Sequence, residues 1–202
     1  FLSSIGINFF GSDPVSAGFG LFNAGGIIFM IIGIGLSKML ADKYGKRNVF
    51  GVFLFISTLF ILVFYVLSPD SINLIFGAQI FHGFFYGITI PLLWAMIADV
   101  ADYSEWKNNR RATAIIFSAM MVGLKLGLSI GGALVASILG SYGYVPNSVG
   151  EQTESAILGT KMLVSIFPSI PFLVAAALLF FYVIDKKMED KIEQDLLKKR
   201  KS

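Results

Sequence analysis

Residues Ala112–Leu139 read ATAIIFSAMMVGLKLGLSIGGALVASIL, an apolar run that contains a single charged residue, Lys125. Each residue of a helix adds ~1.5 Å of length, so about 20 residues cross the ~30 Å hydrocarbon layer of a bilayer. The run is therefore long enough to span a membrane, and its composition predicts a transmembrane helix.

Four other segments have the same character: Ala17–Ser37, Val49–Leu67, Ile72–Ala98 and Ala156–Ile184. Only 14% of the 202 residues are charged, whereas a soluble domain carries about 25%. Residues Phe1–Phe10 are also apolar, but a helix of that length extends only ~15 Å. We expect this stub to be the end of a sixth span whose beginning is missing. The sequence therefore predicts an all-α, polytopic membrane helix bundle.

Basic residues occupy alternate connections between these segments, together with the C-terminal tail. The other connections, near residues 11–16, 68–71 and 141–155, contain no Lys or Arg. By the positive-inside rule the basic side is cytoplasmic. We predict a helix bundle over residues 1–184 and a cytoplasmic charged tail over 185–202. The basic side carries Lys38, Lys43, Lys46, Arg47, Lys107, Arg110, Arg111, Lys186, Lys187, Lys191, Lys198, Lys199, Arg200 and Lys201.

Several classes of function lack the residues they need. The chain has no cysteine and a single histidine, His82, so the sequence offers neither a thiolate nor a histidine-cluster metal site. It also lacks a recognisable nucleophile–base pair and a glycine-rich phosphate loop. We therefore expect no enzymatic activity, no metal site, no cofactor and no nucleic-acid partner.

Lys125 is the first candidate functional residue. A cation at the centre of a span costs a few kcal/mol unless it is paired or faces water. The acidic residues all lie in connections, at span ends or in the tail, so the counter-charge must come from missing helices, a second subunit or a ligand. A lysine bonded to backbone carbonyls is the alternative.

Small residues surround Lys125 on its helix. Gly123, Gly127 and Gly131 form consecutive small-xxx-small steps, which let a neighbouring helix pack closely. Gly123 and Gly127 each lie two residues, or about 200°, from Lys125, so the lysine points from the opposite face. We assign three further residues near the lysine face to a predicted cavity: Ser118, Met121 and Ser129.

A second cluster of charged residues follows the span Ile72–Ala98. Asp99 and Asp102 are three apart and share a helix face. We predict that these carboxylates face Arg110 and Arg111 and form with them an ion-pair network that opens and closes. Tyr103 and Glu105 lie between the carboxylates and the arginines in the sequence. The alternative is a solvated loop whose exposed pairs are worth at most about 1 kcal/mol each.

Other features fit the same topology. Asp42, Gly45, Lys46 and Arg47 form a predicted loop in which Gly45 permits a tight turn. Pro91, Pro168 and Pro171 are expected to bend or break helices. In the tail, Met188, Ile192 and Leu196 are four apart, which indicates a helix. Either this helix is a solvated extension of the last span, or it lies on the membrane as an anchor.

Taken together, the motifs resemble the glycoside–pentoside–hexuronide:cation symporters, the melibiose-permease-like branch of the major facilitator superfamily. The resemblance rests on PLLWAMIADVADYSEWK at 91–107, on RRATA at 110–114 and Phe117-Ser118, and on LKLG at 124–127 and GYVPN at 143–147. The loop at 42–47 likewise resembles the superfamily's turn between paired helices. The order and spacing of these blocks cover nearly the whole chain.

The resemblance implies a bacterial inner-membrane transporter of twelve helices, of which this chain is the C-terminal six, the first in part. It implies sodium- or proton-coupled glycoside import, with the cation bound chiefly by the missing N-terminal half. It also implies that Lys125 lies near the central cavity, and that Asp99, Asp102 and Arg111 belong to a cytoplasmic gate.

Two residues mark a departure from the melibiose-type carriers. Those carriers have a tryptophan nine residues before the first gate aspartate, where this chain has Ile90. Its tryptophan is Trp94, five residues before Asp99. The motifs Pro-Leu-Leu-Trp and Asp-Tyr-Ser-Glu-Trp resemble those of the xyloside and oligosaccharide members. We include Ile90 and Trp94 in the predicted cavity. The alternative for Trp94 is a tryptophan at the membrane interface. Other functions that remain open are a lysolipid carrier of the same fold and a truncated, non-transporting membrane partner.

Overall fold

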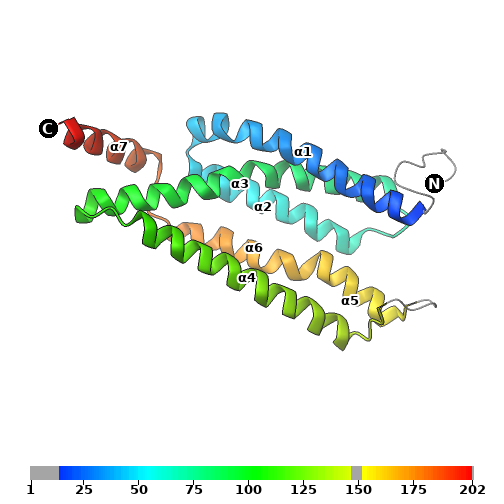
Figure 1. Cartoon of the computed structure of the whole chain (residues 1–202). Coiled ribbons are helices and arrows are strands. Elements are labelled where there is room, and N and C mark those ends of the chain that lie inside the picture. The colour runs from blue at the N-terminus through cyan, green and yellow to red at the C-terminus, as the bar shows by residue number, and fades with distance from the viewer. Residues whose placement is uncertain (1–13, 147–151, 202) are drawn as a thin grey trace.

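The computed structural model describes residues 14–146 and 152–201, and all its elements are helices (Figure 1). The predicted stub Phe1–Phe10 lies outside the described residues. The helices are α1 (Pro14–Tyr44), α2 (Lys46–Val66), α3 (Ile72–Asn108), α4 (Thr113–Ser141), α5 (Glu154–Val164), α6 (Ile166–Leu178), the short 3₁₀ helix η2 (Leu179–Phe181) and α7 (Lys186–Lys201).

Five stretches of the described chain are long and apolar enough to cross a membrane, and they correspond to the five predicted spans. Two predicted spans, Ala17–Ser37 and Ile72–Ala98, end too early, because a helix does not end where its apolar stretch ends. α1 continues to Tyr44, and α3 continues ten residues beyond Ala98 to Asn108. The segment from Asp99 to Lys107 was placed beyond the end of the span, but it continues the same helix. Its charged side chains therefore stand on a rigid element.

The last span is interrupted at Ser165, between α5 and α6. Pro168 explains the position of the break, because it has no N–H to donate to the carbonyl of Val164, the last residue of α5. The hydroxyl of Ser165 donates to the carbonyl of Lys161 at 2.5 Å, and that of Ser169 donates to the carbonyl of Ser165 at 2.6 Å. The expectation that proline breaks this span is confirmed, although Pro171 lies within α6 without ending it.

The closest helix–helix contact joins α1 and α3. A Cβ atom built on Gly83 would lie 2.3 Å from the carbonyl oxygen of Gly26, and one built on Gly87 would lie 2.2 Å from that of Met30. On the opposing helix, a Cβ on Gly33 would lie 2.2 Å from the carbonyl oxygen of Phe84. These distances leave no room for a side chain, so the two backbones are in direct contact.

α7 does not continue the last span as a straight extension, as one reading of the tail predicted. The chain leaves helical geometry at Tyr182, and α7 begins at Lys186 after a short extended segment. Figure 1 shows α7 apart from α6, at the end of the bundle where α3 meets α4. Ile192 and Leu196 are buried there against Val100 and neighbouring residues of α3.

α4 is the least buried of the spanning helices. In the described part of the chain, none of its residues is buried. Leu128 is 71% exposed, and a Cβ on Gly123, Gly127 or Gly131 would meet no atom within 4 Å. The predicted small-residue steps of α4 therefore have no packed neighbour among the described residues, and this apolar helix presents its surface to lipid or to other helices.

Substitution of Gly83 tests the α1–α3 contact. We expect Gly83→Ala to lower the free energy of unfolding by about 1–3 kcal/mol, because the added methyl group forces two backbones apart. Thermal unfolding of the purified protein in detergent measures the change. Gly77→Ala on the same helix is the control, since its Cβ meets nothing within 4 Å. Equal stability of the two variants would contradict the role of the contact.

Candidate functional site

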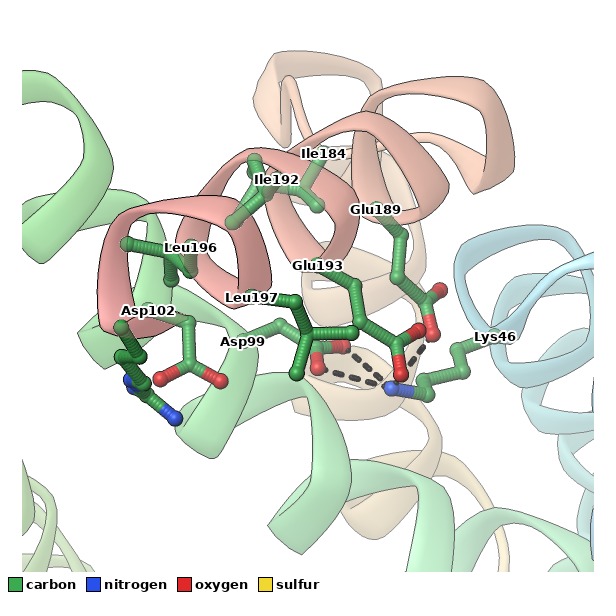
Figure 2. Close-up of a pocket in the computed structure, with 10 residues that line it drawn as sticks. Lys46, Asp99, Asp102, Ile184, Glu189, Ile192, Glu193, Leu196 and Leu197 are labelled. Carbon is green, nitrogen blue, oxygen red and sulfur yellow. Dashed lines mark hydrogen bonds and ion pairs between the residues drawn. The ribbon is translucent and has the colours of Figure 1, made fainter. Parts of the chain in front are cut away.

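The ammonium group of Lys46 lies between two carboxylates at the end of the bundle (Figure 2). It donates to both carboxylate oxygens of Asp99 on α3, at 2.7 and 2.8 Å, and lies 2.8 Å from Oε1 of Glu189 on α7. The three side chains are only 16–29% exposed. Because water screens them weakly, these pairs are stronger than pairs on an open surface.

Gly45 sets the position of Lys46. It is the single residue between α1 and α2, and its φ of 83° lies in the region that favours glycine. A Cβ at Gly45 would also lie 3.2 Å from the Cβ of Lys186. The predicted loop of residues 42–47 is thus a one-residue turn, and it places Lys46 on the first turn of α2, facing α3 and α7. Asp42 takes part through its backbone carbonyl, which accepts from the ammonium group of Lys186.

A second group of ion pairs gathers around Arg111, just before α4. Its guanidinium lies 3.6 Å from carboxylate oxygens of both Asp102 and Glu105 on α3. Arg200 of α7 lies 3.3 Å from the same Glu105 carboxylate. Arg111 is 55% exposed, so each of its pairs is worth at most about 1 kcal/mol. These weak contacts link α3, the start of α4 and α7 at the surface.

α7 is held to α3 by further contacts. The indole N–H of Trp106 donates to Asp195 at 3.0 Å, and the ammonium group of Lys191 lies 5.6 Å from the centre of the same indole ring. Next to α7, the hydroxyl of Tyr182 donates to the carbonyl of Met96 at 3.2 Å. Burial, followed by the negative charges of Asp99 and Glu189, raises the pKa of Tyr182 above its ordinary value, so the phenol remains a neutral donor.

These groups surround a cavity of about 330 Å³ between α2, α3 and α7. Its wall combines the charged residues with the apolar side chains of Ile184, Ile192 and Leu196. Figure 2 shows Glu193 pointing into the same opening as Lys46. The cavity holds more carboxylates than cations, but in the described residues no group of three or more His, Cys, Asp or Glu side chains has the arrangement of a metal site.

The structure brings together most of the predicted gate residues, partly with the expected partners and partly with others. Arg111 contacts Asp102 and Glu105, whereas Asp99 contacts Lys46 and not an arginine. Arg110 is engaged through its backbone carbonyl, which accepts from Ser104. Tyr103 packs its ring 6.0 Å from that of Trp106, under α7.

Sequence reasoning missed the contributions of Glu189 and Arg200. Both belong to a tail whose position depends on where the chain turns after η2, and no local pattern encodes that turn. Helical spacing of the apolar residues Met188, Ile192 and Leu196 was the available signal. It indicated an amphipathic helix, which requires an apolar surface to pack on, and α3 provides that surface.

The predicted cavity residues are not drawn together by contacts within the described chain. Lys125 is exposed on α4, and it has no ion pair or hydrogen bond to any residue that the structure describes. Ile90 and Trp94 lie one turn apart on α3, and Trp94 is 42% exposed. The remaining predicted cavity residues are exposed on α4: Ser118, Met121 and Ser129.

Comparison with known proteins decides the class of this molecule. Residues 2–186 match the family described as MFS/sugar transport protein. The chain belongs to this family of membrane transporters. The family consists of membrane transporters of the major facilitator type, and the named relatives are transporters and symporters, not enzymes.

Three relatives illustrate its place among the MFS/sugar transport proteins. An uncharacterized 29.9 kDa protein of Pseudescherichia vulneris is 35% identical over 158 residues, 78% of this chain and 57% of that protein. The putative glycoside/cation symporter YagG of Escherichia coli (strain K12) is 30% identical, over 81% of this chain and 35% of that protein. The isoprimeverose transporter of Lactiplantibacillus pentosus is 29% identical, over 98% and 41%, respectively.

These relatives confirm the resemblance to the glycoside–pentoside–hexuronide:cation symporters. The chain spans only 35–57% of their lengths. Its all-helical bundle is accordingly a partial transporter fold of the major facilitator superfamily.

Lys46 is the residue to change first in this charge cluster. Lys46→Met leaves Asp99 and Glu189 facing each other without a cation, so we expect the protein to lose about 1–3 kcal/mol of stability. Detachment of α7 should accompany this loss, seen as faster tryptic cleavage at the lysines of α7. Arg111→Gln is the control, with an expected loss below about 1 kcal/mol. Unchanged α7 cleavage in Lys46→Met would refute the assignment.

Proposed function

We propose that this chain forms the C-terminal half of a sodium- or proton-coupled glycoside symporter, which works by rocking against an N-terminal half. The observation that carries the proposal is the state of α4. This span exposes Lys125, a cation with no ion pair or hydrogen bond to any residue that the structure describes, and a charge within the membrane is costly unless other helices cover or pair it. A second six-helix half would supply both the packing surface and the carboxylates.

In this proposal Lys125 couples the binding of the cation to the binding of the sugar. Carboxylates of the N-terminal half would bind the coupling cation next to Lys125, so its ammonium group would sense whether the cation is present. Ser118, Met121 and Ser129 would line the same cavity on α4, with Ile90 and Trp94 on α3. Trp94 offers an indole surface of the kind on which sugar rings stack.

The charge cluster around Lys46 and Arg111 would form the cytoplasmic gate. Its pairs join α2, α3 and α7, and the Arg111 pairs are weak enough to break during each transport cycle. The Lys46 pairs are more buried and would hold the three helices together while the gate opens. The half would thus move as one body.

The relatives' names support the proposed substrate class. One is named a glycoside/cation symporter and another an isoprimeverose transporter, so we propose a glycoside or oligosaccharide as the substrate. No cofactor enters this mechanism, since the gradient of Na⁺ or H⁺ supplies the driving force.

Uptake measurements test the function as a whole. Labelled xyloside and galactoside are offered to cells under an imposed sodium or proton gradient, with the chain expressed either alone or together with a matching N-terminal half. We expect uptake only when both halves are present. Uptake by the chain alone would contradict a half-transporter, and stimulation by lysolipid without glycoside uptake would favour the lipid-carrier alternative. Absence of all transport would favour a non-transporting membrane partner.

Lys125→Ala tests the coupling role in the same assay. We expect it to abolish gradient-driven accumulation, because the cavity loses the cation that pairs with the carboxylates. Lys38→Ala, at the end of α1, removes an equal charge outside the proposed cavity and should leave uptake intact. Uphill uptake by Lys125→Ala equal to that of the control would eliminate the coupling role.

The proposed orientation places α7 and the charge cluster on the cytoplasmic side of a bacterial inner membrane. The chain has no cysteine, so a single introduced thiol reports its own location. We expect Ser68→Cys in the α2–α3 connection to react with an impermeant maleimide in intact cells, and Asn108→Cys at the end of α3 to react only after permeabilisation. The reverse pattern would invert the topology.

A further inference from the structure

A second cavity, of about 560 Å³, lies between α2 and α6, and neither Lys125 nor the paired charges around Lys46 and Arg111 line it. One wall consists of the face of α2 that runs from Arg47 to Phe55, and the other consists of α6 and η2 from Leu173 to Phe180. We call this cavity the α2–α6 groove. Its lining is apolar except at one end, where Arg47 and Asn48 stand.

Small residues create the groove. Gly51 lies at its floor, where an added Cβ would come within 3.1 Å of Leu179, and Ala176 and Ala177 line the opposite wall. Larger apolar side chains form the edges: Phe55 is 48% exposed and Phe180 is 83% exposed. The groove is therefore open along the surface of the bundle, and aromatic rings border it.

Arg47 differs from its neighbour Lys46. Lys46 is occupied by two carboxylates, whereas Arg47 has no ion pair and no hydrogen bond with any part of the chain that the structure describes. Its side chain is only partly exposed, and it borders the apolar groove. A guanidinium in such a position lacks an anion, and its fork of N–H groups matches a phosphate.

The dimensions of the groove fit one half of a bilayer. From Arg47 to Phe55, α2 rises about 12 Å, whereas one leaflet of hydrocarbon is about 15 Å thick. The polar end coincides with the end of α2 that carries Lys46 and the charge cluster, which lies at the membrane surface, and the apolar part extends toward the membrane centre. A molecule that fills it needs an anionic head and an apolar chain in that order.

We propose that the α2–α6 groove binds an anionic glycerophospholipid, with the phosphodiester at Arg47 and one acyl chain between α2 and α6. Charge complementarity selects this occupant: Arg47, the one basic side chain of the lining, stands at the interfacial end, and an anionic lipid, unlike phosphatidylcholine, carries no cation beside its phosphodiester. The lipid would join α2 to α6, two elements distant in sequence. The site concerns membrane binding and does not depend on which solute the protein transports.

Native mass spectrometry of the purified full chain tests the site. The protein in detergent is given equal amounts of dioleoyl phosphatidylglycerol and dioleoyl phosphatidylcholine, which differ in net charge but not in acyl chains. We expect one tightly held lipid per chain, with phosphatidylglycerol preferred about fivefold or more, the effect of one interfacial cation. Equal retention of the two lipids would overturn the proposal.

Two variants locate the lipid. Arg47→Gln should remove the preference for phosphatidylglycerol, whereas Arg110→Gln should keep it, because Arg110 is an equally basic residue at the same end that does not line the groove. Ala177→Phe should fill the groove and displace the lipid without loss of helicity by circular dichroism. Loss of preference in Arg110→Gln to the same degree as in Arg47→Gln would show general surface charge and overturn the site. A lipid-free dimer that Ala177→Phe disrupts would instead identify a second copy as the occupant.

Discussion

Backbone contact between α1 and α3 is the constraint on which the rest of the structure depends. Three glycines, Gly33, Gly83 and Gly87, bring carbonyl oxygens of one helix to the positions that Cβ atoms would occupy on the other. In a membrane, where lipid and side chains are equally apolar, close packing of this kind is a main source of helix association. With α1 fixed against α3, the one-residue turn at Gly45 places α2 beside them, and the Lys46 ammonium group then reaches Asp99.

Two kinds of electrostatic contact occur at the end of this three-helix unit, and burial separates them. Lys46 and its partners are largely covered, so their ion pairs hold α2, α3 and α7 together. The Arg111 contacts are longer and more exposed, so thermal motion and salt can open them readily. The proposed transport cycle would need both kinds: strong contacts that keep this half rigid, and weak contacts that break when it moves.

Much of the fold could be predicted because hydrophobic length and charge asymmetry are local properties of the sequence. The five spans and the break before Pro168 follow from such properties. The ends of α1 and α3 could not be predicted, since charged residues continue a helix beyond the hydrocarbon layer as easily as they end it. The sequence singled out the glycine steps of α4, but the tightest packing uses glycines of α1 and α3. Spacing shows where close packing is possible, and only the three-dimensional arrangement shows which helix approaches.

The candidate site was predictable in the same uneven way. Asp102, Glu105 and Arg111 are close in sequence, and their pairing follows from one helix end and one short connection. Asp99 was assigned to the arginines, yet its partner is Lys46, 53 residues earlier. Lys125 was recognised because an isolated charge in an apolar run is conspicuous. Its partners could not be predicted, because none of the described residues pairs with it.

The position of α7 has a consequence for how the protein is made. Since α7 follows the five spanning stretches of the described chain, the ribosome synthesises it after them. Until then Lys46 has Asp99 as its carboxylate partner, and the apolar patch formed by Val100, Tyr103 and Trp106 remains uncovered. Docking of α7 thus comes after the assembly of α2 against α3 on this face. Quality-control proteases in the cell would recognise a chain with α7 undocked by this exposed apolar patch.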